Sequence, residues 1–449
     1  MFENKRFLVF GAGISGMGSI KLLSTITDKI VLYDGNAELD IQVVKEKYGV
    51  EADFDICLGE LKPEILDQVD IAVLSPGVPT DKPEVLAMQA KGIEVWGEVE
   101  LAYRFNKGQL IAITGTNGKT TTTSLVGEIM KAHVNKVYVT GNIGIAYTTC
   151  APQTTDESAT VLEISSFQLE TTKEFHPQVS AILNITPDHL DRHHTFENYA
   201  QAKYDITKNQ TEQEACILNY DDENTRNFGE RCVPRAVFFS STSELSKGYY
   251  MKGSQLIFND GQTEQMLCDV KDVKLLGKHN YENIMAAIAV CHEAGVPFET
   301  IIPVVKDFNA VEHRIEFVVE KAGVKYYNDS KGTNPDAAIK AVEAMERPTI
   351  LIGGGYDKHS NYDEWIQSFG DKIKLLVLIG QTKEQIKEAC DRLGFTNTIL
   401  CDTFEEAVDT CVKNAVSGDA VLLSPACASW GMFRNYEERG RIFKELVRK

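Results

Sequence analysis

A glycine-rich stretch that contains a lysine lies at residues 115–121, where it reads GTNGKTT. It follows an apolar, β-branched run at 110–114 and precedes apolar residues with helical spacing, so we expect a buried strand, a tight turn and a helix. Backbone amides at a helix N-terminus, a lysine and a hydroxyl are the groups that bind a nucleoside triphosphate with Mg²⁺. The stretch therefore predicts a phosphate-binding loop, although its glycines are closer together than in the standard P-loop. The alternative is a glycine turn that binds nothing.

A second glycine motif, GAGISG at residues 11–16, follows an apolar run at 6–10. A second expected strand at 30–33 ends at Asp34, which completes the usual context of a dinucleotide-binding turn. A nicotinamide dinucleotide is one interpretation of this motif. The diphosphate of a UDP-sugar is another, because the same turn can hold any diphosphate.

Glu163 comes directly after an expected strand at 160–162. A carboxylate at the end of an apolar strand, beside a phosphate-binding loop, is how nucleotide-binding proteins present a ligand for Mg²⁺. By itself such a glutamate is more often a solvated loop residue, so this interpretation depends on the loop at 115–121.

A polar segment at residues 184–194, NITPDHLDRHH, follows another expected strand and holds three of the nine histidines. The spacing matches no zincin pattern, and no cysteine is near. His189 is the strongest candidate ligand, because open α/β sheets bind ligands where their strands end. His193 and His194 fit a polar loop equally well. Lys203, on the next helix, is by its position an ordinary solvated charge.

Strands and helices alternate over most of the chain, so the expected fold class is α/β with three domains. We expect a Rossmann-like N-terminal domain at residues 1–97, a central P-loop ATPase-like α/β domain at 98–310 and a C-terminal doubly wound α/β domain at 311–449. Short β-rich segments at 216–266 predict a further sheet that flanks the central one.

Polar clusters follow several expected strands of the last domain. They occupy residues 328–334, residues 353–355 with Lys358, and residues 424–429. Because the carboxyl ends of parallel strands meet at one edge of a sheet, the clusters favour a ligand crevice there. Each of them could instead be a turn that reverses the chain.

Acidic residues outnumber basic ones in this chain of 449 residues, with 65 Asp and Glu against 46 Lys and Arg and a formal net charge of −19. In the absence of a basic cluster, this charge argues against a nucleic-acid partner or an anionic membrane. The sequence shows no signal peptide and no apolar window long enough to span a membrane. Ten cysteines without a CxxC pair suit a reducing compartment. We therefore expect a cytoplasmic protein with small-molecule partners.

A series of motifs occurs in the order found in one family of amide ligases. They are TGTNGKTT at 114–121, GNIG at 141–144, LEISSFQLE at 162–170, DHLDRH at 188–193, HN at 279–280, EHR at 312–314, NDSKGTN at 328–334 and SPACAS at 424–429. In these motifs the chain resembles the Mur ligase family over essentially its whole length. SPACAS, followed by MFRNYEERG at 432–440, is specific to the branch that adds D-glutamate.

The resemblance implies an ATP-dependent ligase of peptidoglycan precursor synthesis, with two Mg²⁺ sites. ATP would phosphorylate the L-alanine carboxylate of UDP-N-acetylmuramoyl-L-alanine, and the amine of D-glutamate would attack the acyl phosphate. The enzyme would act as a monomer. The alternatives are a ligase of the superfamily that adds another amino acid, a folylpolyglutamate synthase or, in a different class, an NAD-dependent oxidoreductase with an NTPase-like domain.

The resemblance also assigns catalytic roles to Lys119, Glu163, His189 and Lys203, and a metal-binding role to Thr120. Lys119 would contact the transferring phosphate, while Thr120 would bind the first Mg²⁺. Glu163 and His189 would bind the second Mg²⁺ together with Lys203, which is carbamylated in the family. Carbamylation would turn an ammonium group that repels Mg²⁺ into an anion that binds it.

The remaining residues implied by the resemblance fall into three groups. On the ATP side they are Gly115, Thr116, Asn117, Gly118, Lys119, Thr120, Thr121, Asn280, Arg314, Asp329 and Lys331. For the UDP-linked substrate they are Gly13, Ile14, Ser15, Gly35, Asn36, Gly77 and Asn142. For D-glutamate they are Thr333, Lys358, Ser429 and Tyr436. Two positions depart from the best-known pattern, because Tyr436 replaces a phenylalanine and Gly35-Asn36 lacks an arginine found in some relatives.

Overall fold

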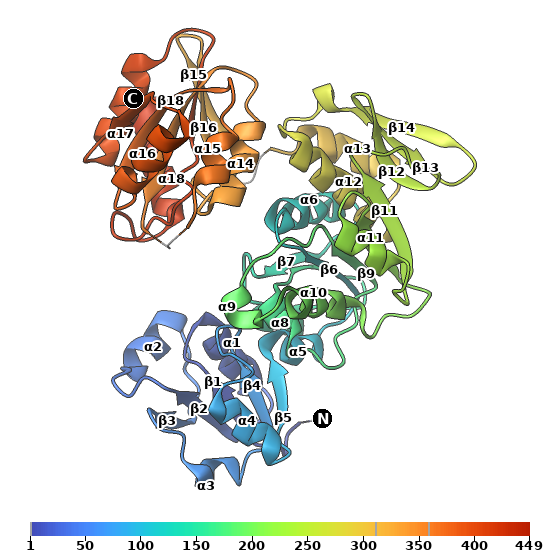
Figure 1. The fold of residues 1–449 in the computed structure, drawn as a ribbon. Helices are drawn as coiled ribbons and strands as arrows, with labels where there is room; N and C mark the ends of the chain where they lie inside the picture. The colour runs from blue at the N-terminus through green and yellow to red at the C-terminus, as the bar shows by residue number, and fades with distance from the viewer. Residues whose placement is uncertain (1, 310–311, 358–359) are drawn as a thin grey trace. The chain divides into compact units, whose positions relative to one another are not determined.

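The structure is a computed structural model that describes residues 2–309, 312–357 and 360–449. The chain divides into two compact units. Unit 1 comprises Met1–Asp269 and Glu282–Val305, and unit 2 comprises Val270–Tyr281 and Lys306–Lys449. Strands and helices alternate in both units, which confirms the expected α/β class (Figure 1). The expected boundary between residues 310 and 311 lies outside the described residues.

The N-terminal part of unit 1 is a parallel sheet with strand order β3-β2-β1-β4-β5. Its strands are β1 (Phe7–Phe10), β2 (Ile30–Asp34), β3 (Asp55–Leu58), β4 (Ile71–Leu74) and β5 (Glu94–Gly97), and its helices are α1 (Ile14–Leu23), α2 (Ile41–Tyr48), α3 (Pro63–Leu66) and α4 (Pro83–Ala90). The strand order reverses direction between β1 and β4. The turn after β1, which carries GAGISG, therefore lies at the switch point where such sheets bind ligands.

Both faces of this sheet are buried, which explains why β1 reads as an unbroken apolar run. Phe7 and Val9 point into a core that includes Met17 and Ile20 of α1. Leu8 and Phe10 point into a second core on the other face, which includes residues of α3 and α4. Alternate residues of one strand thus hold helices on opposite faces of the sheet.

The rest of unit 1 is built on a sheet with strand order β14-β13-β12-β11-β10-β9-β6-β8-β7. Its strands are β6 (Gln109–Thr114), β7 (Val137–Gly141), β8 (Ala159–Glu163), β9 (Val179–Ile182), β10 (Ala215–Asn219), β11 (Arg235–Ser240), β12 (Gly248–Lys252), β13 (Gln255–Asn259) and β14 (Glu264–Asp269). Its helices are α5 (Glu98–Tyr103), α6 (Lys119–Lys131), α7 (Tyr147–Cys150), α8 (Ser166–Leu169), α9 (Leu190–His193), α10 (Phe196–Tyr204), α11 (Glu223–Gly229), α12 (Lys278–Glu293) and α13 (Phe298–Asp307).

The expectation of a separate sheet at residues 216–266 is wrong. Strand β10 pairs in parallel with β9, so the later strands extend the sheet that contains β6. The pairs β12–β13 and β13–β14 are antiparallel and lie at one end of this sheet. The sequence of a short β segment does not show which strand it will pair with, because tertiary packing decides the pairing.

Unit 2 contains a sheet with strand order β15-β16-β20-β17-β18-β19, in which β15 is an antiparallel edge strand. Its strands are β15 (Glu316–Lys321), β16 (Val324–Asn328), β17 (Thr349–Gly355), β18 (Ile373–Gly380), β19 (Thr398–Leu400) and β20 (Ala420–Leu423). Its helices are α14 (Pro335–Glu343), α15 (Asp363–Gln367), α16 (Lys383–Leu393), α17 (Phe404–Asn414) and α18 (Tyr436–Arg448). One core packs α14, α15 and α16 on one face, and a second packs α17 and α18 on the other (Figure 1).

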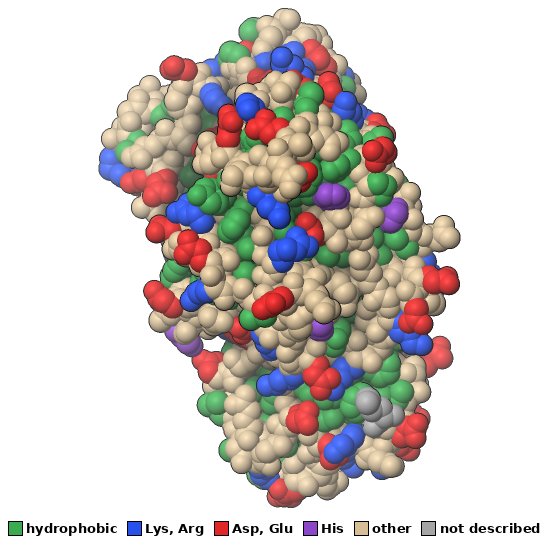
Figure 2. All heavy atoms as spheres, turned by 90° about the vertical axis from the view of Figure 1, so that its right-hand side faces the viewer, with side chains coloured by type: hydrophobic (Ala, Val, Ile, Leu, Met, Phe, Trp, Pro, Cys, Tyr) green, Lys and Arg blue, Asp and Glu red, His purple; other side chains and the backbone are tan. Residues whose placement is uncertain are grey.

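The surface carries charges of both signs. On the face shown in Figure 2, acidic and basic side chains are interspersed. None of the helices that the structure describes has the length and apolar character needed to cross a membrane.

Candidate active site

The glycine-rich loop at residues 115–121 follows β6 at the centre of a row of parallel strand ends. Strand β6 lies between β9 and β8, with Thr114 opposite Ile182 and Ile113 opposite Glu163. Strand β7 lies beside β8, and Gly141 is opposite Glu163. The loop, Glu163 and the segments that follow β7 and β9 therefore meet at the carboxyl edge of one sheet, where open α/β sheets bind ligands.

The two glycines of the loop are required by its geometry. Gly115 and Gly118 have φ angles of +149° and +85°, a region that side chains disfavour. A Cβ atom on Gly118 would lie 2.2 Å from Oδ1 of Asn283, and one on Gly115 would lie 3.0 Å from Cβ of Leu183. Helix α6 begins directly afterwards at Lys119, so its amide groups and the positive end of its dipole lie at the loop.

Asn184 holds the loop in this shape. Its backbone oxygen accepts from the amide of Thr116 at 2.9 Å, and its Oδ1 accepts from the amide of Asn117 at 2.8 Å. Its Nδ2 donates to the backbone oxygen of Asn117 at 3.1 Å. Neither Asn184 nor Asn283 was predicted as a site residue. Asn184 could have been found from its place at the start of the polar segment after β9, whereas the contact of Asn283 depends on tertiary packing.

Two lysines converge on one carbonyl of the loop. Nζ of Lys119 donates to the backbone oxygens of Gly115 and Thr116 at 2.7 and 2.8 Å. Nζ of Lys203 donates to the same Gly115 oxygen at 2.9 Å and lies 4.6 Å from the ring centroid of Tyr199. Lys203 is only 2% exposed, so the interpretation of this residue as a solvated charge is wrong. Burial, followed by the charge of Lys119, holds the pKa of Lys203 well below its ordinary value.

Glu163 is buried at the end of β8 with one carboxylate oxygen satisfied. Its Oε1 accepts from Nδ2 of Asn142 at 2.9 Å. Its Oε2 is buried without a hydrogen-bond partner among the described residues. Leaving a carboxylate oxygen buried and unpaired is costly, and a bound cation would relieve that cost. The environment of Glu163 thus fits a metal ligand.

His189 lies in the segment between β9 and α10 but not directly after the strand, because β9 ends at Ile182. It adopts a left-handed backbone conformation with φ +52°, and its side chain is half exposed. Its Nε2 lies 3.5 Å from Oδ2 of Asp188. The described residues contain no group of three or more His, Cys, Asp or Glu side chains placed to hold a metal ion. A metal site that uses Glu163 or His189 would therefore need ligands of other kinds.

The two histidines that follow His189 in the chain, His193 and His194, contact other protein side chains. His193 is buried, with Nε2 3.0 Å from Oγ of Ser166 and Nδ1 3.1 Å from Oε1 of Glu170. Burial, followed by the charge of Arg192, lowers its pKa to about 4. His194 pairs with Asp81 on the surface.

Arg192 links this segment to the N-terminal sheet of unit 1. Its Nη2 donates to Oε2 of Glu170 at 2.8 Å and to the backbone oxygen of Val78 at 3.0 Å. Val78 belongs to the turn after β4 that also contains Gly77. Arg192 and Glu170 line a cavity of about 420 Å³ between the two sheets of unit 1.

The residues predicted for the UDP-linked substrate lie on four turns of unit 1, after β1, β2, β4 and β7. Gly13, Ile14, Gly35, Asn36, Gly77 and Asn142 are exposed and Ser15 is half-buried. The carboxylate of Asp34 accepts from the amides of Ala12 and Asn36, both at 2.9 Å. Asp34 thereby ties the turn after β1 to the turn after β2, and each of its oxygens keeps a further lone pair.

In unit 2 the described residues of the three polar clusters lie at one sheet edge, as expected, because β16, β20 and β17 are neighbours. Asp329 is buried there. Its Oδ2 accepts from Oγ of Ser424 at 2.7 Å, and its Oδ1 accepts from the amide of Ile315 at 3.2 Å. Burial raises the pKa of Asp329 to about 7, opposed in part by the hydrogen bond from Ser424. Nearby, Nζ of Lys331 lies 5.5 Å from the ring centroid of Tyr436.

Other predicted residues of unit 2 are placed as follows. Asn280 is buried at the start of α12, and its Nδ2 donates to the backbone oxygen of Leu276 at 2.7 Å. Arg314 is half-buried, and its charge acts on Asp329. Thr333 is half-buried and Ser429 is buried. Lys358 lies outside the described residues.

A buried glutamate, Glu98 of α5, is joined to the LEISSFQLE motif. Its Oε1 accepts from Nε2 of Gln168 at 2.7 Å, while its Oε2 is buried without a partner among the described residues. Burial raises the pKa of Glu98 from 4.5 to about 7. The folded state therefore keeps a proton that the unfolded chain loses, and stability falls as pH rises through this interval.

Replacing Glu98 with glutamine removes this titration and keeps the acceptor for Gln168. We expect the difference in melting temperature, Glu98→Gln minus the parent, to grow between about pH 5 and pH 8. The corresponding change in the free energy of unfolding is at most about 3 kcal/mol. Thermal melting across this range measures the effect, with the exposed Glu157→Gln as control. A difference that does not vary with pH would contradict the burial argument.

Three models of known protein families match the chain, one for each of the three sheets that the described residues form. The family model described as Mur ligase MurD-like, N-terminal domain, matches residues 5–97. The Mur ligase middle domain matches residues 113–291, and the Mur ligase, glutamate ligase domain, matches residues 313–427. A protein of Lachnospira eligens named UDP-N-acetylmuramoylalanine–D-glutamate ligase is 56% identical over 445 residues, which cover 99% of each chain.

The chain belongs to the Mur ligase family. A protein of Lachnoclostridium phytofermentans with the same name is 53% identical to this Mur ligase, over 99% of this chain and 98% of its own. The expected three-domain organisation is confirmed by the three family matches.

Solved Mur ligases share the fold at much lower identity. A crystal structure of MurF from Acinetobacter baumannii has a TM-score of 0.62 at 15% identity and covers 99% of this chain and 93% of its own. MurC from Thermotoga maritima has a TM-score of 0.60 at 18% identity and covers 99% of both chains. MurF from Thermotoga maritima, solved in complex with ADP, has a TM-score of 0.61 at 16% identity and covers 99% of this chain and 98% of its own. At these identities the likeness shows the fold alone.

Proposed function

We propose that this Mur ligase joins D-glutamate to UDP-N-acetylmuramoyl-L-alanine and that ATP drives the reaction. The observation that carries the proposal is the 56% identity, over 99% of the chain, to a relative named for this activity. The name fits the geometry of unit 1, where a glycine loop opens helix α6 beside two lysines and a buried carboxylate. The match of residues 5–97 to the MurD-like N-terminal domain argues against the NAD-dependent alternative.

The reaction has two steps. A carboxylate oxygen of the L-alanine residue attacks the γ-phosphorus of ATP, the bond from that phosphorus to the β–γ bridging oxygen breaks, and ADP leaves. The amine nitrogen of D-glutamate then attacks the acyl carbon, loses a proton and displaces inorganic phosphate, so that an amide remains. The alanine carboxylate and the phosphates are all anionic, and the cationic side chain of Lys119 is placed to offset their repulsion.

We further propose two metal positions. Thr120 at the start of α6 would hold one Mg²⁺, and Glu163, His189 and a carbamylated Lys203 would hold a second. The unpaired Oε2 of Glu163 and the depressed pKa of Lys203 support this assignment. Bound Mg²⁺ would screen the charges of the phosphate and carboxylate groups as they come together.

The exposed turns of unit 1 offer backbone amides to the UDP-linked substrate at Gly13 and Gly77, and the exposed Asn142 is proposed to contact it as well. Residues Asn280, Arg314, Asp329 and Lys331 of unit 2 are proposed to contact ATP. Thr333, Lys358, Ser429 and Tyr436 are proposed to bind D-glutamate. We expect the enzyme to act as a monomer in the cytoplasm, where ATP and its UDP-linked substrate are available.

The proposal is tested by measuring phosphate release from ATP with UDP-N-acetylmuramoyl-L-alanine and one amino acid at a time. We expect release with D-glutamate and only background with L-glutamate, L-lysine or meso-diaminopimelate. The matching product should appear by mass spectrometry, one glutamate residue heavier than the substrate. Equal release with the other amino acids would refute the D-glutamate assignment, and release that does not need the UDP-linked substrate would refute the ligase reaction.

A further inference from the structure

A buried arginine joins the polar strand ends of unit 2. Arg439 lies in the first part of α18 and is 0% exposed. Its Nε donates to Oγ of Ser330 at 2.9 Å, and its Nη2 donates to the backbone oxygen of Ser330 at 2.7 Å. Its Nη1 donates to the backbone oxygen of Cys427 at 3.2 Å. One planar guanidinium group thus contacts two separate segments with fixed geometry.

Both segments carry residues proposed to bind substrates. Ser330 lies between Asp329 and Lys331, and Cys427 lies two residues before Ser429. Oγ of Ser330 also donates to the backbone oxygen of Tyr436 at 2.8 Å. Arg439 and Ser330 therefore fix the start of α18, the segment after β16 and the segment after β20 in one hydrogen-bonded unit.

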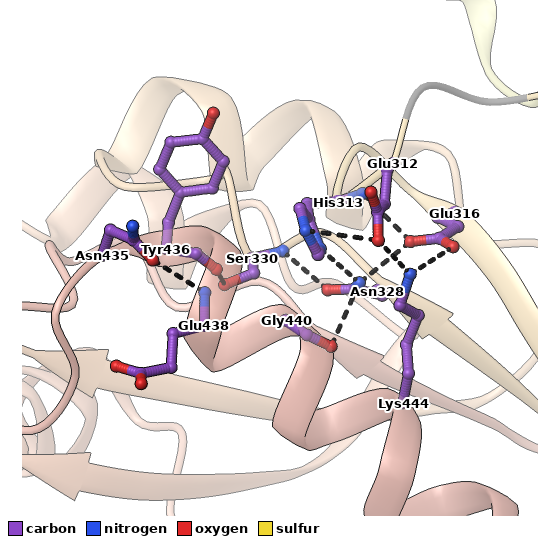
Figure 3. Close-up of polar contacts among 10 residues, drawn as sticks. All are labelled: Glu312, His313, Glu316, Asn328, Ser330, Asn435, Tyr436, Glu438, Gly440 and Lys444. Atoms are coloured by element: carbon purple, nitrogen blue, oxygen red, sulfur yellow. Dashed lines mark hydrogen bonds and ion pairs between the residues drawn. The ribbon is translucent and has the colours of Figure 1, made fainter. Parts of the chain in front are cut away.

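A second set of contacts, around His313 and Asn328, also holds α18 in place (Figure 3). Nδ2 of Asn328 lies 2.9 Å from Nδ1 of His313, 3.0 Å from Oε2 of Glu316 and 3.5 Å from the backbone oxygen of Gly440. A Cβ on Gly440 would lie 2.2 Å from Nδ1 of His313, so only glycine allows this approach. The ring of Tyr436 lies edge-on to the ring of His313, with 6.1 Å between the ring centroids. Helix α18 thus buries the side chain of Arg439 completely and leaves that of Tyr436 partly exposed.

A charge in this position is an unusual way to stabilise a fold. A buried ion is desolvated, and apolar residues of similar volume often give equal stability. Burial lowers the pKa of Arg439 to about 10, so the group remains charged near neutral pH, and the charge of Asp329 opposes that shift. The feature that an apolar side chain cannot reproduce is the set of three directed donors. This points to geometry, rather than stability, as the reason for an arginine.

We propose that Arg439 is a positioning residue that sets the placement of Ser429 and Tyr436 relative to Asp329 and Lys331. The inference rests on the proposed function, because it assigns the first pair to the D-glutamate side and the second pair to the ATP side. Loss of the guanidinium group should displace the glutamate side most, since Cys427 and the start of α18 would both lose a contact.

The test compares Arg439→Met and Arg439→Lys with Arg441→Met, a matched control at an exposed position of the same helix. Steady-state kinetics give kcat and KM for D-glutamate and for ATP, and thermal melting reports folding. We expect KM for D-glutamate to rise about tenfold or more in both Arg439 variants, because lysine keeps the charge but not the fork of donors. The control should stay within about twofold of the parent.

Ser330→Ala provides a second measurement if Arg439→Met fails to fold. It removes one acceptor of Arg439 and the donor to Tyr436, so KM for D-glutamate should rise in this variant as well. The inference is overturned if kcat falls only with the folded fraction while KM for D-glutamate is unchanged in Arg439→Lys and Ser330→Ala. A parent enzyme that shows no D-glutamate-dependent phosphate release would instead refute the proposed function.

Discussion

Replacing Lys119 with alanine is expected to lower kcat/KM for ATP by about 10³-fold, as when a preorganised charge on a transferring phosphoryl group is removed. Nζ of Lys119 lies on the backbone oxygens of Gly115 and Thr116, inside the turn that precedes α6. A flexible side chain in this place can move onto a phosphate without a change in the backbone. The amides of the loop would remain in the variant and retain part of the nucleotide affinity.

Phosphate release with saturating D-glutamate measures the effect, and thermal melting checks the fold. Lys131→Ala is the matched control, because Lys131 lies at the other end of α6 and pairs with exposed Glu128. We expect the control to keep full activity and Lys119→Ala to melt near the parent temperature. Activity of Lys119→Ala within tenfold of the parent would show that the lysine has no role in phosphoryl transfer.

The α/β class could be predicted because buried parallel strands read as short apolar runs between helices. Strand β1, with all four residues buried, is an example. Strands that lack such an apolar run were not predicted from the sequence. Strand β3 has two exposed residues at its start, and the edge strand β15 has no fully buried residue. Helix α13 was also missed, because it contains Pro303 and follows α12 closely.

Residues of the candidate site were predictable where local chemistry marks them. Gly115 and Gly118 are such positions, because their backbone conformations require glycine. Asn283 approaches Gly118 from a helix that is distant in the sequence, and no local sequence pattern predicts that contact. Lys203 is a similar case. Its burial arises because α10 packs against the loop after β6, whereas the sequence around it reads as an ordinary amphipathic helix.

The environment of Lys203 leads to the second prediction, that this lysine acts as a carbamate. An amine must be neutral to attack CO₂, and burial together with the charge of Lys119 favours the neutral form. The nitrogen forms a bond to carbon and releases a proton, so a carbamate anion replaces the amine. Lys203, which shares the Gly115 carbonyl with the cationic Lys119, would then carry a negative charge that attracts Lys119.

Lys203→Ala is therefore expected to lose about 10²-fold or more of kcat, the scale seen when a group that stabilises transition-state charge is removed. Acetate or bicarbonate should restore part of this activity, because a small carboxylate can occupy the space vacated by the side chain and supply the missing anion. Phosphate release measured against acetate concentration should rise to a plateau. The matched control is Lys119→Ala, in which a cation is missing, so acetate should give no rescue there.

Carbamylation can also be observed without turnover. ¹³C NMR of the parent in ¹³C-labelled bicarbonate should show a carbamate signal that is absent from Lys203→Ala and disappears on acidification. If Lys203→Ala turns over normally without added carboxylate, the residue has no catalytic role. If the variant is inactive, acetate fails and the parent gives no carbamate signal, the free amine itself must be the functional group. Its hydrogen bond to Gly115 would then act by shaping the loop that Lys119 also contacts.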